Sequence, residues 1–300
     1  MAKPVVDIGV AISKMQSPKW WVGAMGEIMR AKDRGTIEVG SILTVGSALN
    51  DHMRNGIADL FIKPDNVAEN RNNVVAESQG EYLFWMDDDT VPPHMAIEKL
   101  LKLETDIAAG VYFRRNPPYN PIAYRRTSNG LYASLWNYQP GEILRADSVG
   151  MGCTLVHHSV YERIQEAHIL FYRADHHTCI AVHRDDLVNV QRLPEELRPP
   201  APYPYNTPPW RDKVVVSNDG IYRMQALELR HDEPDHWPFY ALEHERTEDH
   251  HFCERAKRVG CRILVDTFVE CHHVGESAVT GDHFREMRRK ALEEGLDENP

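Results

Sequence analysis

At residues 81–91 the sequence reads Glu81-Tyr82-Leu83-Phe84-Trp85-Met86-Asp87-Asp88-Asp89-Thr90-Val91, and two prolines follow. The uncharged, aromatic-rich part of this stretch (82–86) is typical of a short strand that is buried on both faces, as in a parallel sheet. Burying three unpartnered carboxylates would cost more free energy than one domain can supply. We therefore expect the aspartates at the carboxyl end of the strand, where open α/β sheets bind their ligands.

The three aspartates allow two interpretations. If the backbone stays extended, Asp87 and Asp89 point to one face and Asp88 to the other. Two carboxylates on one face would suit Mg²⁺ or Mn²⁺ that also binds a diphosphate. The alternative is a turn with an acidic helix cap, because aspartate is common in such turns. The residues favour metal binding, but they do not exclude a turn.

The composition limits the class of protein. Three hundred residues suffice for one large α/β domain, and 42% apolar residues allow a substantial core. We expect no membrane span and no signal peptide, because no apolar run approaches the roughly 18–20 residues that cross a bilayer. Five irregularly spaced cysteines indicate a reducing cytoplasm and no disulfide framework. A net charge of −11 argues against a basic coat for nucleic acid, but it leaves a local basic groove open.

Alternating strand and helix patterns predict an α/β fold with a mostly parallel sheet flanked by helices. One domain is expected at 1–276, with an irregular, proline-rich insertion or lid at 168–235. A charged, solvated helical tail is expected at 277–300. Strands are expected at 5–12, 37–45, 82–86, 106–112, 146–156 and 261–269, and helices at 20–32, 66–77, 93–103, 159–167 and 243–260.

Four segments, taken in order, resemble the nucleotide-sugar glycosyltransferases of the GT-A (Rossmann-like) fold, in the large family-2-like group. The likeness covers roughly residues 3–160 and 240–276, and the proline-rich region has no counterpart in it. The four segments are the first strand (5–13), the helix with Arg71-Asn72 that leads to the DxD-like Asp87-Asp88-Asp89, the strand Gly150-Met151-Gly152-Cys153-Thr154-Leu155-Val156, and the run from Thr247-Glu248-Asp249 to His273-Val274-Gly275.

The resemblance implies a metal-dependent, inverting transfer from a nucleoside-diphosphate sugar, with a UDP-sugar as the expected donor. It gives Asp87 and Asp89 the metal and diphosphate role. His273 is implied as the third protein ligand, and the adjacent His272 is the less favoured alternative. Mn²⁺ accepts an imidazole ligand more readily than Mg²⁺ does.

The resemblance also implies that Asp249 is the general base that takes the proton of the acceptor hydroxyl. Without the resemblance, Glu248 and Asp249 would be interpreted only as helix caps. Arg71 is expected either to approach the diphosphate or to be solvated on its helix. The remaining expected donor contacts are Ala11 and Ser13 beside the base, Asp65 or Asn66 at the base or ribose, and Asp88 at the ribose or sugar.

The sequence leaves two classes of acceptor possible. Residues 110–119 and 266–271 are similar to compact phage-type glycosyltransferases, some of which act on hydroxymethylated pyrimidines in DNA. The rival acceptor is a cell-surface glycan or a lipid-linked sugar. Cytoplasmic location is expected, in a bacterial host if the chain is phage-encoded. The side chains that would serve a flipped base and its flanking phosphates are Arg114, Arg115, Arg125 and Arg126 with Tyr112, Tyr119 and Tyr124.

Two other functional classes are alternatives to a glycosyltransferase. A non-catalytic nucleotide-binding protein on the same fold would be indicated by loss of Asp249 or of the aspartates, and all of these are present. A nucleotidyltransferase usually carries a glycine-rich phosphate loop near the N-terminus. The corresponding residues, Ser13-Lys14-Met15-Gln16, do not form such a loop.

Overall fold

The computed structural model describes most of the α/β domain and short stretches of the proline-rich segment. The described residues are 2–12, 18–46, 57–60, 67–128, 130–172, 178–183, 214–217, 220–223, 227–228, 237, 239–240, 247–274 and 278–293.

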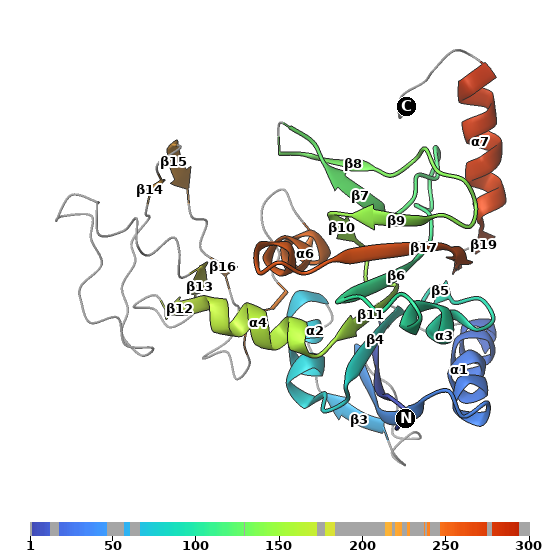
Figure 1. Cartoon of the computed structure of the whole chain (residues 1–300), viewed down its shortest axis with the longest axis horizontal. Helices are drawn as coiled ribbons and strands as arrows, with labels where there is room; N and C mark the ends of the chain where they lie inside the picture. Colours follow the sequence, from blue (N-terminus) through green and yellow to red (C-terminus); the bar gives the residue numbers. More distant parts are fainter. Residues whose placement is uncertain are drawn as a thin grey trace.

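An eight-stranded sheet forms the centre of this part of the chain (Figure 1). The first four strands in its order are mutually parallel, and so are β6 and β17. β11 is antiparallel to both of its neighbours, and β9 is an antiparallel edge strand. The predicted α/β class with a mainly parallel sheet is confirmed. The order is β3 (Ile57–Leu60), β2 (Glu38–Gly46), β1 (Val5–Ile12), β4 (Tyr82–Asp87), β11 (Cys153–His157), β6 (Ile107–Val111), β17 (Ile263–Glu270) and β9 (Ile143–Ala146).

β4 lies in the middle of this sheet and is buried on both faces. Leu83 and Trp85 belong to one hydrophobic cluster, whereas Phe84 and Met86 belong to the other. This division follows from the two-residue repeat of a strand, which sends successive side chains to opposite faces. The expectation of a doubly buried strand before the aspartates is therefore met.

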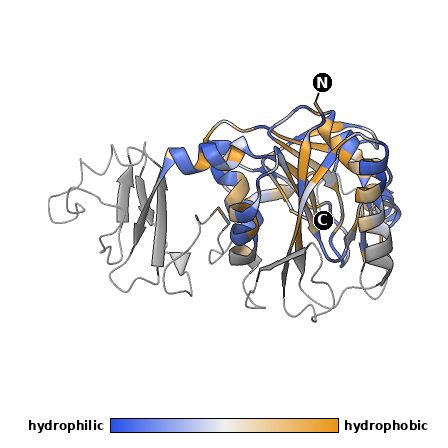
Figure 2. Ribbon diagram, turned by 90° about the horizontal axis from the view of Figure 1, so that it is seen from below, coloured by the Kyte–Doolittle hydropathy of each residue, from blue (hydrophilic) through white to orange (hydrophobic). Residues whose placement is uncertain are grey.

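Helices cover both faces of the sheet (Figure 2). α1 (Pro18–Asp33) and α3 (Ala96–Leu101) contribute apolar side chains to the cluster that contains Phe84. α2 (Val67–Glu77), α4 (Ser159–Ala167) and α6 (Glu248–Arg258) contribute to the cluster that contains Trp85. None of the helices in the described ranges is long and apolar enough to cross a membrane.

Smaller sheets extend the domain. The described part of 168–235 is not irregular, because it forms paired strands, and the prediction is wrong there. The prolines between 194 and 210 lie outside the described residues. The small sheets are β10 (Ser148–Val149) with β7 (Ala123–Arg126) and β8 (Tyr132–Ser134); β19 (Ala278–Val279) with β18 (His272–Val274) and β5 (Thr90–Val91); β12 (His168–Tyr172) with β13 (Thr178–His183) and β16 (Leu227–Glu228); and β14 (Val214–Ser217) with β15 (Gly220–Arg223).

The C-terminal helix α7 (Gly281–Glu293) is packed against the domain and is not merely a solvated tail. Its Phe284 is buried and stacks on Phe113 with ring centroids 5.3 Å apart. Arg288 Nη1 donates a hydrogen bond of 2.7 Å to the Tyr138 carbonyl. The expected solvated tail is wrong because one aromatic residue among the charged ones anchors the helix through apolar burial.

Asp7 of β1 forms hydrogen bonds with β2 and with the residues that precede β4. Its Oδ2 accepts hydrogen bonds from the Ser78 hydroxyl (2.9 Å) and from the backbone N–H groups of Gln79 (2.7 Å) and Gly80 (2.6 Å). Its Oδ1 accepts one from the Ser41 N–H at 2.6 Å. A buried carboxylate is tolerated when several donors satisfy it. Asp7 thereby fixes the connection between α2 and β4, and so the position of β4.

We expect Asp7→Asn to lower the free energy of unfolding by about 2–4 kcal/mol, because an amide group would face N–H donors that need an acceptor. Urea denaturation of the variant and the wild type measures this difference. Glu38→Gln, at an exposed carboxylate on β2, is the control and should change stability by less than about 0.5 kcal/mol. Equal stability of Asp7→Asn and the wild type would contradict the structural role of Asp7.

Candidate functional site

The aspartate run at the end of β4 forms a turn. β4 ends at Asp87, and Asp88 and Asp89 turn the chain into β5. The extended backbone that would place Asp87 and Asp89 on one face is therefore not present, and the chain forms a turn, as in the alternative interpretation. The reason is tertiary, because β5 has to reach β18 and pair with it in antiparallel fashion. Asp88 is buried, and the two flanking aspartates meet different partners.

Arg71 of α2 is a buried cation that contacts three carboxylates. Its side chain is 2% exposed, and its Nη2 donates a hydrogen bond of 3.0 Å to Asp87 Oδ1. Its Nε lies 3.7 Å from Glu248 Oε1 and 3.7 Å from Asp249 Oδ1. Burial by itself would lower the pKa of Arg71, but the three carboxylates raise it on balance. The guanidinium stays charged and holds the end of β4 against the start of α6.

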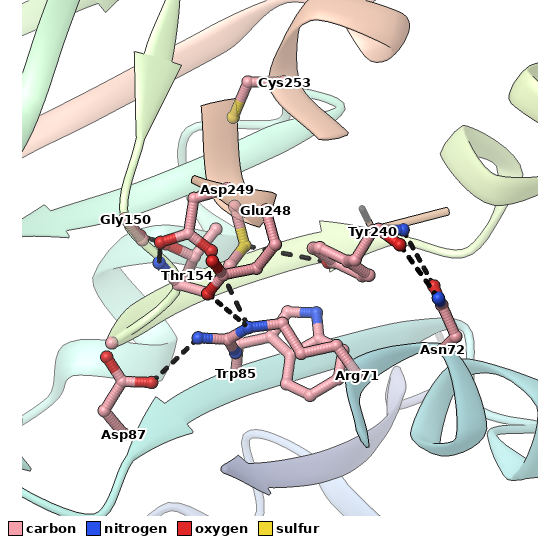
Figure 3. A network of polar contacts seen from close by, with 12 residues as sticks. Arg71, Asn72, Trp85, Asp87, Gly150, Thr154, Tyr240, Glu248, Asp249 and Cys253 are labelled. Carbon is pink, nitrogen blue, oxygen red and sulfur yellow. Dashed lines mark hydrogen bonds and ion pairs between the residues drawn. The ribbon is translucent and has the colours of Figure 1, made fainter. Parts of the chain in front are cut away.

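Aromatic rings enclose this guanidinium (Figure 3). The Arg71 Cζ atom lies 5.1 Å from the ring centroid of Trp85 and 5.9 Å from that of Tyr240. Such cation–π contacts stabilise a cation that has lost its water. Asn72 fixes Tyr240 by accepting from its N–H (2.7 Å) and donating to its carbonyl (2.9 Å). The Trp85 Nε1 donates to the Tyr161 hydroxyl at 2.9 Å, so each ring is itself held in place.

Asp249 lies in the first turn of α6, at the edge of this network. Its Oδ2 accepts a hydrogen bond of 3.3 Å from the Met151 N–H, and its Oδ1 accepts none from any described residue. Burial raises the pKa of Asp249 well above its usual value, the negative charge of Glu248 raises it further, and Arg71 opposes the rise. The side chain as a whole is 18% exposed, although its Oδ1 atom is buried. A carboxylate with a raised pKa is a better proton acceptor than an ordinary aspartate.

Asp89 forms a second cluster with His273 and Arg115. Asp89 Oδ1 lies 3.4 Å from His273 Nε2, and the Arg115 guanidinium forms an ion pair with Asp89 Oδ2. Arg115 Nε also donates to His273 Nε2 at 3.1 Å. His273 Nδ1 donates to the Phe113 carbonyl at 2.7 Å, and burial lowers the pKa of the ring. His273 is therefore a neutral imidazole with its Nε2 lone pair directed at the cluster, whereas His272 is exposed.

Gly150 and Gly152 leave room for Tyr112. The Gly152 N–H donates to the Tyr112 hydroxyl at 3.1 Å, and a Cβ atom on Gly152 would lie 2.8 Å from Tyr112 Cζ and 2.9 Å from Asp87 Oδ2. The close approach that the two glycines predict is therefore an approach to a protein side chain. Burial, followed by the charges of Asp87 and Asp249, raises the pKa of Tyr112, so the hydroxyl stays neutral.

The structure describes only some of the other predicted site residues. The Ala11 backbone is in register with Asp87 on the neighbouring strand, and its contact with the donor's base stays a prediction. Ser13 and Asp65, like Asn66, lie outside the described residues. Within the described ranges, no three His, Cys, Asp or Glu side chains converge as a preformed metal site. Of the three expected ligands, Asp89 and His273 lie together, and Asp87 is turned toward Arg71.

Sequence reasoning missed three contributors to the site. Glu248 had been read only as a possible helix cap, yet it acts on both Arg71 and Asp249. Tyr240 follows the proline-rich segment, and the aromatic run Trp237-Pro238-Phe239-Tyr240 was the available signal. Arg115 was expected to serve an acceptor, but its guanidinium is bound to Asp89. In each case the contact joins segments that are far apart in the sequence.

Comparison with known proteins gives one family match. The model of the family described as glycosyl transferase family 2 matches residues 57–161, a range that runs from β3 into α4. No curated protein sequence matches the chain.

Two solved structures are similar at low sequence identity. The crystal structure of A197 from STIV has a TM-score of 0.39 and 12% identity, with 93% of this chain and 91% of that chain covered. The crystal structure of GalNAc-T7 with UDP, GalNAc and Mn²⁺ has a TM-score of 0.49 and 8% identity. The comparison covers 95% of this chain and 48% of the GalNAc-T7 chain, so this chain spans about half of its length. Likenesses this distant do not assign an activity.

We expect Arg71→Met to lower the free energy of unfolding by about 3–5 kcal/mol at pH 7, because it leaves three carboxylates without their common cation. Removing Arg71 also removes the charge that holds down the folded-state pKa of Asp249, so the missing stability should be partly restored as the pH falls toward 5. Urea denaturation at both pH values measures this. Arg289→Met, at an exposed arginine of α7, is the control. A loss below about 1 kcal/mol, or the same loss at pH 5 and pH 7, would contradict the role of Arg71.

Proposed function

We propose that this chain, whose residues 57–161 match the model of glycosyl transferase family 2, is a glycosyltransferase of the GT-A fold that catalyses a metal-dependent reaction with inversion of the transferred sugar. The donor is a nucleoside-diphosphate sugar, and a UDP-sugar is the first to test. The observation that carries this proposal is the joint attachment of Asp87 and Asp249 to one buried guanidinium. This arrangement supports the proposal, because it brings the carboxylate at the end of β4 close to the carboxylate proposed as the base.

Asp249 is proposed as the general base. Its Oδ1 accepts no hydrogen bond from a described residue, and its pKa is raised by burial and by Glu248. In the reaction it takes the proton of the acceptor hydroxyl while the hydroxyl oxygen forms a bond to the anomeric carbon. The bond between that carbon and the diphosphate oxygen breaks, and the electron pair leaves with the diphosphate. Attack from the side opposite the leaving group inverts the configuration.

The Asp89 and His273 side chains fit a divalent cation. They offer a carboxylate oxygen and a neutral imidazole nitrogen, and the Arg115 guanidinium already occupies a cation's position between them. Asp87 also lies close enough for its charge to act on His273. A bound Mn²⁺ or Mg²⁺ would neutralise the negative charge that develops on the leaving diphosphate. Imidazole ligation favours Mn²⁺.

For the acceptor, we propose a hydroxymethylated pyrimidine in DNA. Arg125 and Arg126 are exposed on β7, whose partner β10 packs against α6, the helix that carries Asp249. Exposed arginines in this position would neutralise phosphates that flank a flipped base. Tyr112 and Tyr124 are buried, so they are not the exposed aromatic surface that the sequence suggested. The half-buried Tyr132 stacks on His250, next to Asp249, with ring centroids 4.4 Å apart.

A reducing compartment such as the cytoplasm is proposed as the setting of this enzyme. Cys153, Cys253, Cys261 and Cys271 are free thiols and all are buried. Burial raises the pKa of the Cys253 thiol to about 12, which keeps it protonated and unreactive. Thiols of this kind are structural and do not require oxidation for stability.

We expect Asp249→Asn and Asp89→Asn to lower kcat/KM for sugar transfer by at least about a hundredfold, since one removes the base and the other a cation ligand. The assay supplies a UDP-sugar, Mn²⁺ and duplex DNA with or without hydroxymethylated pyrimidines, and it measures both released UDP and labelled DNA. Asp33→Asn, at an exposed carboxylate at the end of α1, is the control and should retain wild-type activity.

The outcomes of this assay separate the parts of the proposal. Full activity in both variants would refute the assigned roles. Donor cleavage with no labelled DNA, together with transfer to a glycan or lipid-linked sugar, would refute the DNA acceptor and leave the glycosyltransferase reaction intact. If no nucleotide-sugar is cleaved but UDP still binds, the result would favour a non-catalytic nucleotide-binding protein.

The pH dependence of kcat/KM should reflect the protonation state of Asp249. The base has to be deprotonated, so activity should rise with pH through a pKa above that of an ordinary aspartate. Glu248→Gln removes a negative charge that raises the pKa of Asp249. We therefore expect the acidic limb of its pH profile to shift to lower pH. An unchanged limb, or a shift to higher pH, would show that the limb does not arise from Asp249.

A further inference from the structure

The cluster at the turn after β4 holds a protein cation where a metal ion is expected. The Arg115 guanidinium contacts Asp89 Oδ2 and donates through Nε to His273 Nε2 at 3.1 Å. The Arg115 side chain thus binds to both Asp89 and His273, two of the expected metal ligands. The neutral imidazole has one lone pair, on Nε2, so a divalent cation and this guanidinium cannot both bind that nitrogen.

Asp89 and His273 are held firmly by the fold. Thr90 and His273 are paired across β5 and β18, and the Val274 N–H donates to the Asp89 carbonyl at 2.6 Å. The Phe113 carbonyl accepts from His273 Nδ1, which leaves Nε2 as the nitrogen that faces the cluster. Tyr112 packs edge-on against the imidazole with ring centroids 5.6 Å apart. These contacts involve the backbone and the far side of the imidazole, so they would persist without Arg115.

Arg115 is the loosely held partner. Its side chain is 47% exposed, whereas those of Asp89 and His273 are 19% and 12% exposed. It extends from the loop that follows β6, where the Arg114 N–H donates to the Asn120 carbonyl at 3.0 Å. The backbone is therefore fixed while the long side chain can rotate into solvent. Ion pairs with so exposed a partner contribute little free energy, so this pair is easily broken.

We propose that Arg115 is an internal counter-cation that competes with the divalent metal and changes partner when the donor arrives. Without ligands it neutralises Asp89. When Asp89 and His273 bind a metal ion, the guanidinium leaves them and binds an oxygen of the donor's diphosphate, a group that arginine recognises well. This inference rests on the metal-dependent part of the proposed function.

The test is a titration of the full chain with Mn²⁺ alone, in which electron paramagnetic resonance measures the free ion. We expect Arg115→Ala to bind Mn²⁺ about three- to tenfold more tightly than the wild type, because no ion pair has to be broken. Arg114→Ala is the matched control, since Arg114 is also exposed but lies over the Tyr124 ring. It should leave the Mn²⁺ affinity unchanged. Asp89→Asn should abolish high-affinity binding and so identify the site.

A second titration, with UDP at saturating Mn²⁺, distinguishes a change of partner from a purely structural role. Arg115→Ala should bind UDP about tenfold more weakly while it binds Mn²⁺ alone more tightly. These opposite shifts would support the inference. Weaker Mn²⁺ binding, or unchanged UDP binding, would overturn it.

Failure of this inference can be told apart from failure of the proposed function. If the wild type and Arg115→Ala bind Mn²⁺ equally and transfer requires it, only the inference about Arg115 is wrong. If neither binds Mn²⁺ and transfer survives a chelator, the metal-dependent part of the proposed function is wrong and the inference falls with it. Loss of that chelator-resistant transfer in Arg115→Ala would make the guanidinium itself the cation of the site.

Discussion

The buried guanidinium of Arg71 is the constraint on which the site depends. An isolated charge inside a protein costs several kcal/mol, and so does each unpaired carboxylate. Arg71 and its three partners make their mutual burial tolerable, with two aromatic rings replacing water around the cation. Because the partners come from the end of β4 and the start of α6, one charge cluster holds the carboxyl end of β4 next to the proposed base. The same cluster leaves Asp249 with a raised pKa.

The turn at Asp88 and Asp89 divides the aspartate run between two electrostatic environments. Asp87 is paired with the buried Arg71, whereas Asp89 lies beside His273 and the more exposed Arg115. Each carboxylate therefore has a cation of its own, a buried one for Asp87 and a half-exposed one for Asp89. An overall acidic chain thus carries local positive charge at this end of β4. The site is composite, because its two clusters draw on residues near 71–89, 115 and 248–273.

The sequence predicted the sheet better than the site. The uninterrupted uncharged run at 82–86 identified a strand with two buried faces, and this signal is local. Asp249 was a candidate base only through the resemblance to a known family, because its local pattern indicates no more than a helix cap. The C-terminal tail was predicted to be solvated because most of its residues are charged. This was wrong because one aromatic residue, Phe284, is buried against the domain. The packing of that ring on Phe113 depends on a residue 171 positions away.

By itself, the sequence determined the α/β class, the position of the aspartates at a strand end and the candidate residues for the chemistry. Only the tertiary structure decided which of these residues meet. It buried Arg71 where a helix residue could equally have been solvated, turned the chain after Asp87 and placed Arg115 between Asp89 and His273. The physical reason is that backbone periodicity is set by neighbours in the chain, whereas the partner of a charged side chain is set by strand order and burial, which no local pattern encodes.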